Sequence, residues 1–422
     1  MSERSASARR NERLWWWIHR TGLSYTAFAR ELWMTAELNG RSDLRPDRTR
    51  IGHWVNDAQM PQHPMPDYLA QTISRLCSCT VTTADLGLSQ RPAPGAEHLG
   101  VVDVATSFSR SVVSTDLSTS EIDELESRVD ELAIVYPTRR PEELWDEAMG
   151  RRQQAHALLH HRRHTLREGR EIARCAGMLS VILAWLSHDG GDQQAVKAWA
   201  VDATAHGQQA DAPEVIAWAE DVLATDALYD NRPLDALTAA TRGLAVAPRS
   251  SDASIRLTAQ VARAQACLGN AEGFADAARH TEALSSSLTS CWSGLFRPDK
   301  AQIGFFNASS YLWLDRPREA QSAALDSINH YRSLEMPAVA PTRLAVAELD
   351  LALAQAALDE PDEAVRAGRS ALSGARLVHA IVGRAEHLGR ELRRRYPGRT
   401  NVTEFLEMVH ELRQGLETTP VR

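Results

Sequence analysis

A short stretch near the N-terminus, from Asp47 to Asp57, carries side chains whose types and spacing suit contact with nucleic acid. A helix that begins after Asp47, with that carboxylate as its cap, would present four hydrogen-bonding side chains on one side. They are Arg48, Thr49, Arg50 and His53. A helix whose first turn is cationic and rich in donors is what the major groove of DNA admits. An ordinary amphipathic surface helix with two arginines is the alternative, and this stretch alone leaves both interpretations open.

The opposite side of the same helix and its neighbours predict a small helical domain. Ile51, Trp54 and Val55 recur at helical spacing and predict a buried face. Residues 11–20 predict a first helix, and Ser24 is placed to cap a second helix that carries an apolar face through Leu32. A polar segment, roughly 37–45, then leads to the third helix. A fourth amphipathic helix follows the prolines at 61–66, and residues 83–88 close the domain.

Residues 12–88 resemble the Cro/C1-type (XRE) helix-turn-helix family. The matching residues are Phe28, Ala29 and Leu32 on the second helix, Thr49, Ile51 and Trp54 on the third, a Pro-containing loop, and the closing Asp85-Leu86. The resemblance implies a DNA-binding domain in which Arg48, Thr49 and His53 read bases. It also implies that Arg50, Ser24 and Tyr25 contact phosphates. The chain departs from the family between Leu32 and Pro46, where a longer connection replaces the usual short turn.

Length, charge and cysteine usage bound the remaining possibilities. A chain of 422 residues is too long for one compact core. Residues 1–90 carry 11 arginines and 9 acidic residues, whereas the remainder carries 36 basic and 46 acidic residues, which suits a basic head on an acidic body. The five cysteines are scattered, without zinc-ligand spacing, and are expected to be reduced thiols of a cytosolic protein. We expect no signal peptide, no membrane span and a cytoplasmic location.

Residues 91–120 predict a linker, because a Pro/Gly-rich run is followed by Ser and Thr without clear periodicity. From residue 121 onward the pattern is helical. One long helix, expected to reach His164, carries His156, His160 and His164 at intervals of four. No carboxylate stands at ligand spacing in it, so a solvated basic face is favoured over a metal site, and no metal or cofactor is predicted.

Beyond residue 170 one local pattern recurs, in which two Ala-rich helices flank a small or turn-forming residue. The turn residues are Gly190, Asn231, Gly269, Asp315 and Asp359, spaced 41, 38, 46 and 44 residues apart. Small residues at fixed places let two helices approach closely, and each helical hairpin needs a neighbour to bury its remaining face. The pattern predicts a stack of hairpins, although an irregular helical bundle is the alternative.

The hairpins resemble the tetratricopeptide repeat. The residues that match that family's pattern are Ala236, Ala240, Gly243, Leu244 and Pro248 in the Asn231 copy, Tyr311, Asp315, Ala320 and Ala324 in a later one, and Asp359, Ala364, Ala371 and Leu372 in another. The expected fold is therefore all-α, with a helix-turn-helix domain at 1–90, a linker at 91–120 and an α-solenoid of tetratricopeptide-like hairpins at 121–415.

In such a stack the first helix of each hairpin lines a concave surface. Register places eight residues toward it: Trp218, Asp221, Thr225, Arg256, Arg263, Gln302, Phe305 and Ser309. Guanidinium groups and aromatic rings suit a peptide or protein ligand, through its carboxylate and its apolar side chains. Inter-repeat packing would explain the same residues without a ligand.

The chain contains no phosphate-binding glycine loop, nucleophile elbow or metalloprotease signature, so an enzyme is not predicted. Two functions stay open: a DNA-binding transcriptional regulator with a ligand-responsive repeat domain, and a protein–protein scaffold with an N-terminal domain that does not bind DNA. The first turn of the third helix favours the regulator. The whole architecture resembles Gram-positive regulators that join an XRE domain to tetratricopeptide-like repeats, which implies a homodimer held by the repeat domain on double-stranded DNA.

Overall fold

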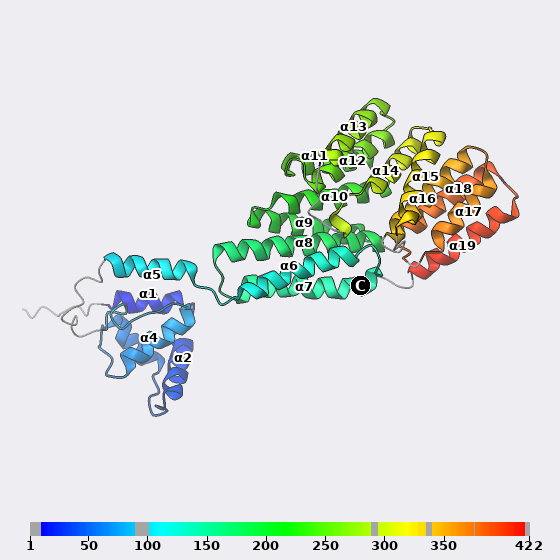
Figure 1. Cartoon of the computed structure of the whole chain (residues 1–422). Coiled ribbons are helices and arrows are strands. Elements are labelled where there is room, and N and C mark those ends of the chain that lie inside the picture. Colours follow the sequence, from blue (N-terminus) through cyan, green and yellow to red (C-terminus); the bar gives the residue numbers. More distant parts are fainter. Residues whose placement is uncertain (1–9, 89–100, 288–293, 335–339, 375, 418–422) are drawn as a thin grey trace, which may run out of the picture. The chain divides into compact units, whose positions relative to one another are not determined.

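The computed structural model describes residues 10–88, 101–287, 294–334, 340–374 and 376–417 of the chain. Within these ranges every regular element is a helix and no strand occurs, which confirms the all-α prediction (Figure 1). The chain divides into two compact units, Met1–Ser109 and Arg110–Arg422. No helix in the described ranges combines the length and apolarity needed to cross a bilayer.

Four helices form the compact part of the first unit, and side chains cap the starts of the first three. The helices are α1 (Glu12–Arg20), α2 (Tyr25–Leu38), α3 (Arg48–Asn56) and α4 (Met65–Cys77). Ser24 Oγ accepts a hydrogen bond from the Ala27 amide, and Asp47 Oδ1 accepts one from the Arg50 amide at 2.8 Å. Helix α2 continues to Leu38, so Glu37, expected in the polar connection, lies within the helix.

One apolar core holds α1 to α4 together. The inward side chains are Leu14, Ile18, Phe28, Leu32, Ile51, Trp54, Val55, Leu69 and Ile73. The Asn11 amide donates to the Val55 carbonyl at 2.8 Å, and Asn11 Nδ2 donates to the Leu86 carbonyl at 3.0 Å. These bonds tie the start of α1 to the end of α3 and to the closing segment. The predicted dry face of α3 is therefore confirmed.

A helix lies within the segment expected to be a linker. Helix α5 (Val101–Val113) contains the boundary between the two units, and residues 89–100 lie outside the described ranges. The second unit proper begins with a pair, α6 (Thr119–Val135) and α7 (Pro141–His161). Helix α7 ends at His161, earlier than predicted, and His164 stands directly before Thr165, whose side chain caps the next helix. Within the described residues no three His, Cys, Asp or Glu side chains are grouped to hold a metal ion.

Six helical hairpins follow. They are α8 (Leu166–Gly190) with α9 (Gln193–Ala210), α10 (Pro213–Tyr229) with α11 (Pro233–Val246), α12 (Asp252–Cys267) with α13 (Ala271–Ser287), α14 (Lys300–Trp313) with α15 (Pro317–Ser333), α16 (Pro341–Ala357) with α17 (Pro361–Leu372), and α18 (His379–Arg395) with α19 (Thr400–Glu417). A short 3-10 turn, η1 (Gly294–Phe296), precedes α14.

The turns inside the first five hairpins share one backbone geometry. The left-handed residues are Gly191, Asn231, Gly269, Asp315 and Asp359, so four of the five predicted turn residues are confirmed and the first lies one residue later. In each turn the next amide donates to the carbonyl five residues earlier at 2.8–3.0 Å. This is the bonding of a Schellman cap, which needs Gly, Asn or Asp at the left-handed position.

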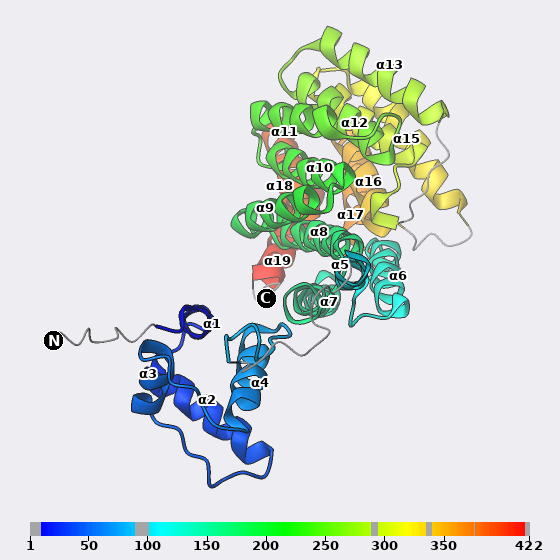
Figure 2. The same cartoon turned by 90° about the vertical axis from the view of Figure 1, so that its left-hand side faces the viewer.

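The first helices of successive hairpins pack on one another, from α8 through α10, α12, α14 and α16 to α18. Helices α8, α10, α12 and α16 are buried along most of their length, whereas α18 and the second helices of the hairpins are amphipathic. Gly177 on α8 lets α10 approach, since a Cβ there would lie 2.6 Å from Val215 Cγ1. Figure 2 shows α8, α10 and α12 one above another. Helix α18 also contacts α8, so the row of first helices closes on itself.

Candidate functional site

The outward face of α3 is the first candidate site. Arg48, Thr49, Arg50 and His53 are all exposed, while the inward side chains of the helix are buried. Because the helix has only nine residues, its exposed cations crowd into the first two turns. Asp47 accepts the Arg50 backbone amide and caps the helix, and the side chains of Arg48 and Arg50 are exposed to a partner. The face predicted from sequence is therefore present as a geometric feature.

Three of the predicted contact residues also make contacts of their own. His53 Nδ1 lies 2.6 Å from Asp57 Oδ2, so only Nε2 of the ring can be offered to a ligand. Ser24 Oγ is exposed and caps α2. Tyr25 is half-buried, with its ring 6.2 Å from the ring of His19. Ser24 and Tyr25 therefore lie at the N-terminus of α2, where amides favour an anion.

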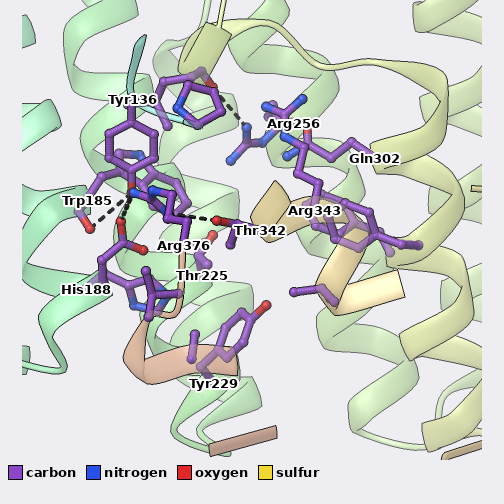
Figure 3. A pocket seen from close by; sticks show the side chains of 18 of the residues that line it. Tyr136, Trp185, His188, Thr225, Tyr229, Arg256, Gln302, Thr342, Arg343 and Arg376 are labelled. Carbon is purple, nitrogen blue, oxygen red and sulfur yellow. Dashed lines mark hydrogen bonds and ion pairs between the residues drawn. The ribbon is translucent and has the colours of Figure 1, made fainter. Parts of the chain in front are cut away.

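The second candidate site is a cavity lined by first helices of the hairpins together with the turn after α6, η1 and the connection between α17 and α18. Its volume is about 100 Å³, several times the roughly 10–15 Å³ that one water molecule needs. Figure 3 shows Tyr136, Trp185 and His188 on one side of it and Arg256, Gln302 and Arg343 on the other. The apolar part of the wall comes from Leu295, Phe305, Phe306, Val346 and Val378.

Five of the eight residues predicted to line a groove line this cavity: Thr225, Arg256, Arg263, Gln302 and Phe305. The structure does not place the other three in the cavity lining. Trp218 packs on Phe296 with ring centroids 5.2 Å apart, and Asp221 is fully buried beside Arg256. Ser309 donates to Asp350 Oδ2 at 2.7 Å. These three residues instead contact neighbouring segments, namely Phe296 of η1, Arg256 of α12 and Asp350 of α16.

The cavity is shut on one side by Arg376, in the connection between α17 and α18. Its guanidinium lies 2.6 Å from Asp189 Oδ2, and it donates to the Arg139 carbonyl at 2.9 Å and to Thr342 Oγ1 at 2.9 Å. Tyr136 donates to the same Asp189 oxygen at 2.5 Å. These contacts join α6, α7, α8, α16 and α18 around the cavity.

Burial affects the pKa values of Arg376 and Tyr136, which both bind Asp189 in this cluster. Although burial opposes its charge, the neighbouring Asp189 carboxylate raises the pKa of Arg376. Burial, together with the same carboxylate, raises the pKa of the Tyr136 phenol well above its ordinary value. The cluster is thus a carboxylate that accepts from a charged arginine and from a neutral phenol. Sequence reasoning missed it, since its members stand far apart in the chain and show no shared periodicity.

Most of the arginines that line the cavity are neutralised by a carboxylate. Arg256 lies 2.8 Å from Asp221, and Arg343 lies 2.5 Å from Asp299. Arg376 is paired with Asp189. Arg263 differs from all of these: it is 2 % exposed, and no carboxylate among the described residues lies within ion-pair distance of it. Burial lowers the pKa of the Arg263 guanidinium, yet an arginine remains charged at neutral pH.

A second compartment adjoins the first. Its volume is about 560 Å³, and its wall is more polar, with Asp226, Asp230, His387 and Arg390 among the lining residues. The two compartments share His188, Tyr229, Arg263 and Ala380. Arg263 therefore lies at the junction between an apolar compartment and a more polar one.

Comparison with known proteins gives one match, confined to the first unit. The family model described as the SP15 N-terminal domain matches residues 14–89. Helices α1 to α4 are similar to that domain. The match covers the core of the unit and the α3 face, and the hairpins lie outside it. No curated protein matches the chain.

Proposed function

We propose that this protein is a sequence-specific DNA-binding transcriptional regulator whose helical repeat unit senses a ligand. The observation that carries the proposal is the exposed face of α3, where Arg48, Thr49, Arg50 and His53 stand on a helix whose other side is fixed in a core. A rigid helix with cationic, hydrogen-bonding side chains at its N-terminal turns fits recognition of bases in a major groove. A scaffold domain would more often present an apolar or acidic face there.

Dimerisation through the repeat unit belongs to the proposal. One small helical domain reads only a few base pairs, too few to select a site among a genome's competitors. A two-fold dimer doubles the site and sets half-sites about one helical turn apart, or a multiple of it. The second unit offers exposed apolar side chains for such an interface, among them Ile134, Val201 and Leu234. These residues motivate the assignment of the dimer contact to the repeat unit.

Selection from a random duplex library with the full-length protein tests DNA recognition. Enrichment of a defined motif is expected, and Arg48→Ala should weaken binding to that motif by about 1–3 kcal/mol and relax preference at one base position. Arg50→Ala should weaken binding to all duplexes alike and reduce the salt dependence. Arg279→Ala, on the exposed side of α13, removes the same charge and serves as the control. A library that yields no motif, or an Arg48→Ala protein that binds like wild type, would exclude this function.

A further inference from the structure

The unpaired charge of Arg263 is the starting point. Its guanidinium lies over three aromatic rings, at 4.4 Å from the centroid of Phe306, 5.8 Å from Tyr229 and 5.9 Å from Trp313. One of its terminal nitrogens donates to Gln260 Oε1 at 2.9 Å, and its Nε has no hydrogen-bond partner. Cation–π contacts hold the guanidinium in place without neutralising it. A buried charge without a counter-ion among the described residues is costly, which favours an anion as the ligand of this site.

Other buried polar atoms around the cavity also indicate a ligand-binding site. Arg256 Nε and Trp185 Nε1 are donors without a partner, and Gln302 Oε1 is an acceptor without one. All three residues line the cavity together with Arg263. Buried polar groups in folded proteins are almost always satisfied. A ligand with an anionic, acceptor-rich end and one donor would satisfy several of them at once.

The wall of the cavity and its charge restrict the chemistry of that ligand. Of the four arginines that line the cavity, Arg263 alone has no ion-pair partner among the described residues, which matches a monoanion better than a phosphate dianion. The rest of the lining is largely apolar and aromatic, from Tyr136 and Trp185 to Phe305 and Val346. Burying the apolar body of a ligand against such a wall contributes a favourable free energy of binding.

Closure of the row of helices restricts the shape of the ligand. Arg376 and Tyr136 both line the cavity and both bind Asp189, so the contacts that join α8 to the α17–α18 connection also cover the chamber. An extended peptide needs an open groove along several hairpins, with its two ends free. The chamber of about 100 Å³ admits a compact molecule instead.

We propose that the cavity is a binding site for a small organic monocarboxylate with an apolar body, whose carboxylate pairs with Arg263. The apolar body occupies the chamber lined by Phe305 and Trp185, and the carboxylate lies at the junction where the two compartments meet. The proposal rests on the sensory part of the proposed function. Its test contains no DNA, so a failure to bind DNA and a failure to bind the carboxylate are separate results.

Isothermal titration of the full-length protein with matched pairs of probes tests the site. The acids are hexanoate, 3-phenylpropionate and indole-3-acetate, and each is compared with its own primary amide, which keeps the shape and removes the charge. At least one acid should bind, with its amide at least about tenfold weaker, because a charged hydrogen-bond pair is lost. This comparison uses the wild-type protein and so does not depend on the folding of any variant.

Variants then locate the contact. Arg263→Gln should weaken binding of the acid by at least about tenfold and make acid and amide alike. Arg279→Gln, an exposed arginine on α13, should bind the acid like wild type. Three results overturn the proposal: none of the acids binds, acid and amide bind equally to the wild type, or Arg263→Gln retains full affinity for the acid. Binding of a mixture of heptapeptides in the absence of any acid binding would also overturn it, in favour of an extended ligand.

Discussion

Arg256 and Arg263 both lie on α12 with a buried guanidinium, and each can be replaced by methionine. We expect Arg256→Met to lower the free energy of unfolding and Arg263→Met to leave it close to the wild-type value or raise it. Arg256 is ion-paired with Asp221 at 2.8 Å, and the two side chains are 3 % and 0 % exposed. In Arg256→Met the Asp221 carboxylate stays buried with only Gln260 Nε2, at 3.1 Å, as a side-chain donor. Removing one partner of a buried pair costs about 3–5 kcal/mol, since the remaining charge is uncompensated.

Arg263→Met leaves no carboxylate behind. The methionine keeps much of the apolar stem that packs near Phe306, and the change removes a buried charge that has no counter-ion. Loss of the bond to Gln260 Oε1 opposes this gain by about 1 kcal/mol. The free energy of unfolding without ligand should therefore stay close to the wild-type value or rise.

Thermal unfolding followed by circular dichroism measures both changes. For a cooperative unit of roughly 300 residues, a loss of about 3–5 kcal/mol corresponds to a midpoint lower by about 5–8 °C. Arg256→Met should show such a shift, and adding Asp221→Asn in the same chain should recover part of it. If Arg263→Met lowers the midpoint as much as Arg256→Met does, Arg263 is a structural residue and the argument from its missing counter-ion fails.

Three further outcomes follow from burial in the structure. Trp54→Ala should cost about 3–5 kcal/mol and unfold the first unit, seen as rapid amide exchange in α1 to α4 while the hairpins stay protected. Burial raises the pKa of Cys175 to about 12, so iodoacetamide at pH 8 should alkylate the exposed Cys79 and leave Cys175 intact by mass spectrometry. Arg376→Met leaves the Asp189 carboxylate buried without its guanidinium partner. This change should open the contact between α8 and α18 and raise amide exchange in both helices, and unchanged exchange would show that Arg376 does not hold them together.

Local backbone requirements explain why much of the fold could be predicted from sequence. A left-handed turn position favours Gly, Asn or Asp, so Asn231, Gly269, Asp315 and Asp359 mark the hairpins directly. The caps Ser24 and Asp47 are equally local, because each acts within three residues. Apolar residues spaced three and four positions apart then assign the buried and exposed faces of α3. Each of these signals is contained in one turn of helix.

The cavity could be predicted only in part, because it depends on contacts between distant segments. Register along α10, α12 and α14 places Thr225, Arg256 and Gln302 on the inner side, which is where they lie. The bond from Arg376 to Asp189 joins residues 187 positions apart, and nothing in either local sequence indicates it. Without that contact an open groove is the natural expectation from a row of hairpins. The closure changes the inferred ligand from an extended chain to a compact one.

The residues that close the row of helices are also residues of the cavity wall, which gives the proposed ligand a route to influence the whole unit. A ligand shifts an equilibrium only as far as it binds one state more tightly than the other. Tyr136 and Arg376 contact the chamber and hold Asp189 at the end of α8, so an occupied chamber and a closed row stabilise each other. By linkage, the ligand at 100 times its dissociation constant would add about 2.7 kcal/mol to the closed state if the open state does not bind it. That is comparable to the cost of losing one buried ion pair, so a small anion is sufficient to set whether α18 stays joined to α8.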